Sequence, residues 1–149
     1  MLDPRFIAFA AILILSVSLA LAKGGSPEKL GALIILTMSV LQFGGALFVQ
    51  RKYHSVDVVS VVVDALAVLT FGAIALHAKR AWPIWATSLQ LLSLSSHFAR
   101  EVDPRVPPMI YAVMKSSPTF LVLIVLLLGT LAHMRRVRIN GSDPAWKEW

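Results

Sequence analysis

Long apolar blocks, each close to the length needed to cross a membrane, most strongly constrain what this chain can fold into. A helix needs about 20 apolar residues to span the hydrocarbon core of a bilayer. Several of the blocks are slightly shorter than that, and short polar connections separate them. The five blocks cover residues 6–22, 30–49, 56–76, 82–98 and 118–134.

The composition supports the same interpretation. Hydrophobic residues make up 57% of the chain and charged residues 15%, whereas soluble domains carry about 25% charged residues. We therefore predict an all-α integral membrane protein with about five short transmembrane helices in a compact bundle, or four if the polar block at 82–98 does not span. A single transmembrane domain is expected over residues 1–136, followed by a polar C-terminal tail over residues 137–149.

The start of the last helix is indicated by a local signal. Ser116 and Ser117 precede Pro118, and a hydroxyl cap followed by proline at the first helical position is typical of a helix start. The preceding apolar segment, residues 109–114, is too short to span a membrane. We predict that the stretch over residues 101–117, which contains this segment, forms an interfacial loop with a helical turn.

Aromatic and basic residues at the ends of the blocks indicate how the chain would sit in a membrane. Trp82 and Trp85 are predicted to be interfacial aromatic anchors. Arg135, Arg136 and Arg138 follow the last block directly and place the C-terminus in the cytoplasm. The net charge of +6 favours contact with anionic lipid headgroups. Because the basic residues occur in twos and threes at block ends, we expect no nucleic-acid partner.

Two aspartates interrupt the third apolar block. Helical spacing places Asp57, Ser60 and Asp64 on one face. Asp57 falls in the first turn, where the helix dipole stabilises a negative charge. A charged aspartate at the depth of Asp64 costs on the order of 3 kcal/mol, so this side chain should face protein or water and have a partner.

The fourth block offers such partners, because Gln90, Ser93 and His97 recur at helical spacing. If blocks three and four pack as a hairpin, Gln90 and Ser93 lie near the level of Asp64, and His97 lies near the level of Asp57. Together these residues would form a polar seam. Its hydrogen bonds can stabilise the packing of the two helices, at roughly 0.6 kcal/mol per hydrogen bond. The seam can instead act as a proton or ion relay, or it can contact a partner subunit.

Histidines at the block ends raise the question of a cofactor. His54, His77, His97 and His133 all lie beside predicted loops, whereas paired haem ligands should project into a bundle core. We interpret them as interfacial side chains whose rings reach toward water. The chain has no cysteine, so it has no disulfide, thiol nucleophile or thiolate metal site. We expect no catalytic residues, no cofactor and no metal.

Most of the chain resembles one group of proteins. The segment from Tyr53 to Asp64, the sequence Trp82-Pro83-Ile84-Trp85, the sequence Gln90-Leu91-Leu92 and His97 are similar to small multi-spanning membrane proteins of alphaproteobacterial type, a group without an assigned function. The resemblance implies a location in the bacterial inner membrane and implies nothing about catalysis.

Size and composition together predict a non-enzymatic function. We expect an accessory or assembly subunit of a larger inner-membrane complex, in contact with lipid and with other membrane subunits or a second copy of itself. The alternative is a small proton-linked transporter or channel that uses the polar seam between the third and fourth helices.

Overall fold

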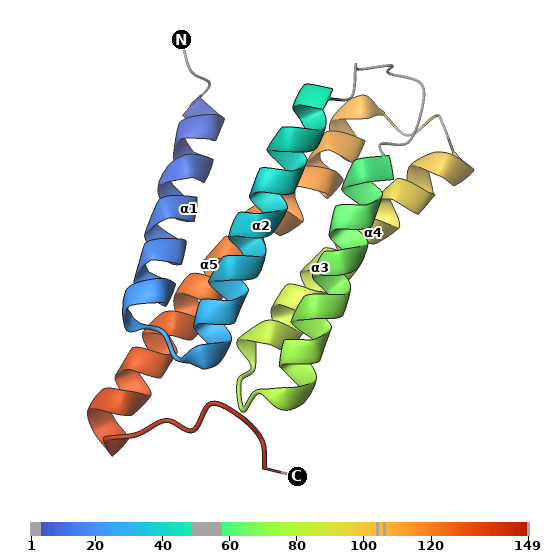
Figure 1. Ribbon diagram of the computed structural model, residues 1–149. Helices are drawn as coiled ribbons and strands as arrows, with labels where there is room; N and C mark the ends of the chain where they lie inside the picture. Colours follow the sequence, from blue (N-terminus) through green and yellow to red (C-terminus); the bar gives the residue numbers. More distant parts are fainter. Residues whose placement is uncertain (1–3, 49–57, 104, 106, 149) are drawn as a thin grey trace.

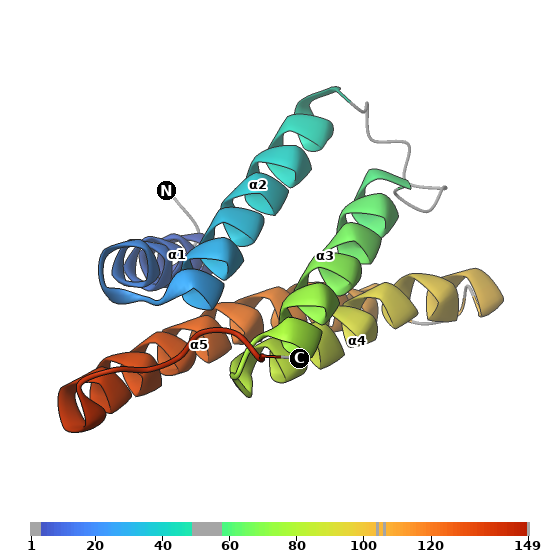
Figure 2. The same cartoon turned by 60° about the horizontal axis from the view of Figure 1, so that its bottom comes forward.

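The protein folds into an all-helical bundle. The computed structural model describes residues 4–48, 58–103, 105 and 107–148. The helices run alternately in opposite directions, and α4 and α5 form a layer against which the other helices pack (Figures 1 and 2). No β-strand occurs among the described residues, so the expected all-α class is confirmed. The helices are α1 (Pro4–Lys23), α2 (Ser26–Phe48), α3 (Val58–His77), α4 (Trp82–Val102) and α5 (Pro108–Asn140).

Among the described residues, two helices have the length and hydropathy of a membrane span. These are α3 and the part of α5 that runs from Pro118 to Asn140. The apolar part of α1, Ile7–Lys23, is shorter. Helix α4 contains Gln90 and several serines, which lower its hydropathy. Length and hydropathy therefore support fewer spans than the five blocks of the sequence.

Helix α5 begins earlier than the sequence indicated. It starts at Pro108 and continues through Pro118, so the loop predicted over residues 101–117 is wrong for residues 108–117. A proline inside a helix leaves one backbone hydrogen bond unmade, because it has no N–H, but a helix can continue through it. The sequence Ser116-Ser117-Pro118 therefore does not prove that a helix starts there. The helix ends at Gly141, whose φ of 74° is left-handed and whose N–H donates to the Val137 carbonyl at 2.9 Å, a common helix terminus.

The C-terminal tail folds back onto the connection between α3 and α4. The backbone N–H of Lys79 donates to the carbonyl of Ala145 at 3.0 Å, and that of Lys147 donates to the carbonyl of His77 at 2.7 Å. The tail is therefore hydrogen-bonded to the bundle. The domain boundary expected at residue 136 lies inside α5.

The core lies where α3, α4 and α5 meet the first two helices. Phe71, Leu123 and Leu126 are completely buried. The Phe71 ring packs edge-on against the Trp82 ring, with centroids 6.2 Å apart and planes at 79°, a favourable aromatic geometry. Small side chains permit close approach of the helices; Ala20, Ala32, Ala67 and Ala86 are completely buried.

Candidate functional site

The first polar cluster joins α3 to α4 and contains three of the residues predicted for the seam. The Ser93 hydroxyl donates to Asp64 Oδ2 at 2.8 Å, and His97 Nε2 lies 3.2 Å from the same oxygen. The side chains of Asp64 and His97 are 5% and 2% exposed. Ser93 and His97 are four residues apart and so share one face of α4. The structure therefore brings these three side chains together.

His97 lies deeper than the sequence indicated. We expected its ring near the level of Asp57 and exposed at the end of a span, and this prediction is wrong because the ring contacts Asp64. In a helix the Cα–Cβ bond tilts toward the N-terminus, which carries the His97 ring back toward Ser93. Ser60, one turn before Asp64, is also buried. Asp57 and His54 lie outside the residues that the structure describes.

Gln90 borders a small cavity next to the first cluster. Its side chain is buried, and its Oε1 atom has no hydrogen-bond partner among the described residues. The cavity has a volume of about 20 Å³, which is enough for one water molecule. Besides Gln90 and Asp64, its polar lining residues are Ser39, Gln42 and Thr119. The cluster thus has a small cavity beside it that both polar and apolar residues of α2, α3, α4 and α5 line.

A second polar cluster lies at the end of the bundle where α2 begins and α5 ends. Arg80 Nε is 3.2 Å from Glu28 Oε1, and Arg80 Nη2 is 2.8 Å from Asp143 Oδ2. The indole N–H of Trp82 also donates to Glu28 Oε1, at 3.0 Å. The Glu28 and Arg80 side chains are 0% and 2% exposed. This cluster joins α2, the connection between α3 and α4, and the tail.

Asp143 receives further donors from α5. His133 Nδ1 lies 2.7 Å and Arg136 Nε 3.0 Å from Asp143 Oδ2. Burial by itself would raise the pKa of Asp143, but hydrogen bonds from His133 and Arg136 and the positive charges of Arg80 and Arg136 outweigh it and lower the pKa. Asp143 is therefore held as a carboxylate that forms ion pairs with both Arg80 and Arg136.

Sequence reasoning missed the second cluster. Glu28, Arg80 and Asp143 are widely separated in the sequence, and no spacing rule connects them. The available local signal is Glu28 in the first turn of α2, where the helix dipole favours an acid. Such a position is ordinarily exposed and does not indicate a buried ion pair.

One predicted membrane anchor is also wrong. Trp82 is buried, with 5% of its surface exposed, whereas Trp85 is 64% exposed. Two glycines make the space for Trp82: a Cβ on Gly129 would lie 2.5 Å from Trp82 Cδ1, and a Cβ on Gly31 would collide with the far edge of the indole. Among the arginines predicted as anchors, Arg136 contacts Asp143; Arg135 and Arg138 are exposed.

An apolar layer separates the two polar clusters. Asp64 and Phe71 are seven residues apart on α3, which corresponds to about 10 Å along the helix axis. Phe71 is completely buried and packs against the Trp82 ring; Leu123 and Leu126 on α5 are also completely buried and belong to the same hydrophobic core. The described core between Asp64 and the second cluster therefore contains large buried apolar side chains.

The described residues contain no group of three or more His, Asp or Glu side chains that could hold a metal ion. Comparison of the chain with protein-family models, with curated proteins and with solved structures found no match.

Proposed function

We propose that the protein is a small multi-pass protein of the bacterial inner membrane and a non-catalytic accessory or assembly subunit of a larger membrane complex. Its outer surface supports a membrane location. Large aliphatic side chains remain exposed on the two span-length helices, among them Leu69 at 68% and Leu76 at 65% on α3 and Leu128 at 59% on α5. Exposed large apolar side chains on span-length helices are compatible with contact with lipid or with another protein.

The apolar layer between the two clusters is the observation that carries the proposal. A transporter needs a polar path across the protein, and the completely buried apolar side chains of Phe71, Leu123 and Leu126 in the core argue against one. Each cluster instead bonds one helix to others. This arrangement supports a stabilising role for the buried polar residues. Such a role is expected in a non-catalytic subunit that binds other subunits of a complex.

Helix α2 provides a surface for a neighbour. Figure 2 shows this helix rising away from the layer formed by α4 and α5. Leu33, Val40 and Leu41 on α2 are 51%, 69% and 46% exposed. A helix that projects in this way can pack against a helix of another subunit as well as against lipid tails.

Fractionation and purification test the two parts of the proposal separately. After an alkaline carbonate wash, the chain should stay with the membrane pellet; recovery in the supernatant would refute the membrane location. Expressed at its native level and extracted in a mild detergent, it should elute as a larger species with another subunit in a constant ratio. A lone monomer in several detergents would refute the accessory function.

A proton-linked transporter or channel is the second candidate, favoured by one specific observation. Asp64 and Gln90 both line the water-sized cavity, Gln90 Oε1 has no hydrogen-bond partner within the described part of the chain, and the His97 imidazole contacts the Asp64 carboxylate. Carboxyl and imidazole groups in membranes often mark proton pathways. Reconstitution into liposomes with an imposed pH gradient should show no flux if the first candidate is right.

Substitutions of Asp64 separate the two candidates further. Asp64→Asn keeps a hydrogen-bond acceptor for Ser93, so the variant should fold, assemble and function. Asp64→Leu should be less stable by about 1 to 3 kcal/mol, because Ser93 and His97 lose their buried partner. Asp103→Asn changes an exposed acid and serves as the matched control. A folded and assembled Asp64→Asn variant without function would favour the relay instead.

A further inference from the structure

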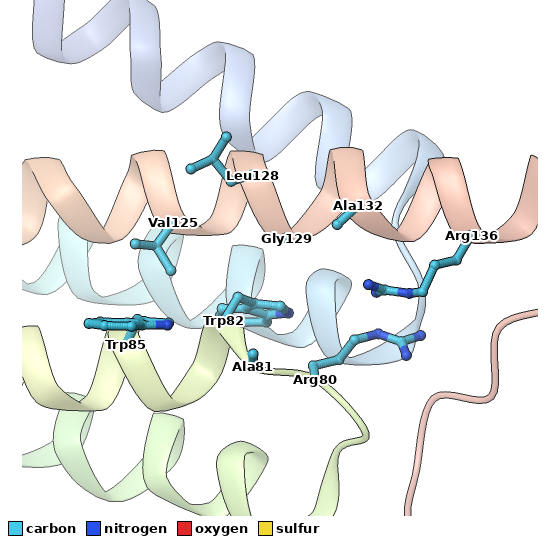
Figure 3. A pocket seen from close by; sticks show the side chains of 9 residues that line it. All are labelled: Arg80, Ala81, Trp82, Trp85, Val125, Leu128, Gly129, Ala132 and Arg136. Atoms are coloured by element: carbon cyan, nitrogen blue, oxygen red, sulfur yellow. The ribbon is translucent and has the colours of Figure 1, made fainter.

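A groove runs along the outside of the bundle between α4 and α5. It has a volume of about 410 Å³, which is within the range of small-molecule sites. Figure 3 shows the Trp82 and Trp85 rings toward one end and the guanidinium groups of Arg80 and Arg136 at the other. The groove is therefore amphipathic along its length, with an apolar part and a cationic end.

The apolar part of the groove is accessible from outside, and Gly129 and Trp82 are tightly packed where they line it. Trp85 and Leu128 are 64% and 59% exposed and line it together with Val125. Gly129 lies against Trp82 so closely that a Cβ would be 2.5 Å from Cδ1. This part of the groove is open and apolar and lies between two packed helices, so it can accommodate a flexible hydrocarbon chain.

The cationic end of the groove offers one accessible guanidinium. Arg80 is buried and already paired with Glu28 and Asp143. Arg136 contacts Asp143 through Nε, but its side chain is 40% exposed, so its terminal N–H groups can reach an anion at the mouth of the groove. A guanidinium can bind two oxygens of one phosphate at the same time.

The surrounding surface has the charge to attract an anion. The end of the bundle that contains Arg136 carries eight basic and three acidic side chains, which gives it a net charge of +5. Basic surfaces of this kind beside membrane helices attract anionic lipids. The basic side chains are Lys23, Lys29, Lys79, Arg80, Arg135, Arg136, Arg138 and Lys147, and the acidic ones are Glu28, Asp143 and Glu148.

We propose that this groove binds an anionic phospholipid of the surrounding bilayer, with its phosphate against Arg136 and one acyl chain along Trp85, Val125 and Leu128. The inference rests on the proposed membrane location and is independent of the accessory function. The positive charge of the surface favours an anionic headgroup over a zwitterionic one. The apolar part of the groove favours a phospholipid, which has acyl chains, over free phosphate.

Lipid binding can be measured on the full chain purified in a mild detergent. Phosphatidylglycerol and phosphatidylcholine, each with brominated acyl chains, are added separately, and quenching of tryptophan fluorescence is recorded. Phosphatidylglycerol should quench at a concentration about tenfold lower. The Trp85→Phe variant should lose most of the quenching, which would assign the signal to the groove.

Three variants test the role of the guanidinium. Arg136→Gln should abolish most of the tenfold preference for phosphatidylglycerol. Arg138→Gln removes the same charge from an exposed residue outside the groove lining and should leave most of the preference. Arg136→Lys keeps the charge without the planar fork and should give an intermediate preference, which provides a test if the glutamine variant does not fold.

Several results would overturn the proposal. Equal losses of preference in Arg136→Gln and Arg138→Gln would show diffuse electrostatic attraction without a site. Quenching as strong in Trp85→Phe as in the wild type would place the lipid elsewhere, and displacement by millimolar inorganic phosphate would show a site for a soluble anion. A detergent-solubilised monomer that still selects phosphatidylglycerol would refute the accessory function while supporting the lipid site.

Discussion

Replacement of Arg80 by methionine should destabilise the protein strongly. Arg80 is 2% exposed and pairs with Glu28, whose side chain is 0% exposed and whose Oε2 atom has no hydrogen-bond partner among the described residues. Without Arg80, Glu28 keeps the indole N–H of Trp82 and becomes a buried acid without a countercharge. Removal of one member of a buried pair typically costs about 3 to 5 kcal/mol, a large fraction of the 5–15 kcal/mol that usually stabilises a protein.

The structure also predicts how a second substitution changes this cost. Glu28→Gln alone should cost about 1.5 to 3 kcal/mol, because Arg80 retains Asp143 and loses one charged hydrogen bond. In the double variant no unpaired charge remains at this position, so its cost should be smaller than the sum of the two by about 1 to 3 kcal/mol.

Denaturant unfolding in mild detergent, followed by circular dichroism, measures the four free energies of this cycle. Arg138→Met is the control, since Arg138 is exposed and its substitution should change stability by less than about 0.5 kcal/mol. If the costs of Arg80→Met and Glu28→Gln add to within about 0.5 kcal/mol, the two side chains are not coupled and the reasoning is refuted.

Two further predictions concern packing and pH. Gly129→Ala should destabilise the protein by about 1 to 3 kcal/mol, because the new Cβ would lie 2.5 Å from Trp82 Cδ1. The control Gly44→Ala should be neutral or stabilising, since a Cβ there meets nothing within 4 Å. Thermal unfolding measures both variants, and equal effects on stability would contradict the packing of Gly129 against Trp82. The lowered pKa of Asp143 means that its carboxylate stabilises the fold above its ordinary pKa of 3.8 and that this contribution is lost as the pH falls from that value through the lowered pKa. The stability difference between the wild type and Asp143→Asn should therefore be largest at neutral pH and shrink below about pH 4; a constant difference across this range would show that ionisation of Asp143 is not involved.

Local sequence information was sufficient to locate most helices and part of the first cluster. The apolar block at 56–76 corresponds to α3, Val58–His77, and the block at 82–98 lies inside α4. The connection between these helices is short, so they must be antiparallel neighbours. Helical periodicity then indicates which of their faces meet, and Asp64 and Ser93 come together as a consequence.

Local information failed where two structures satisfy the same rule. Pro118 is compatible with the first turn of a helix and with the interior of one, and in the structure it lies inside α5. The orientation of Trp82 was equally undetermined, because an aromatic residue at the end of an apolar block can face lipid or the core.

By itself, the sequence determined the helical class, the position of most apolar segments and the pairing of α3 with α4, because these depend on residues within one helical hairpin. Only the tertiary structure decided that Glu28, Arg80 and Asp143 form a buried ionic cluster and that Gly129 admits the Trp82 ring to the core. The physical reason is that spacing rules describe neighbours along one helix. A contact between distant segments depends on how all the helices pack together.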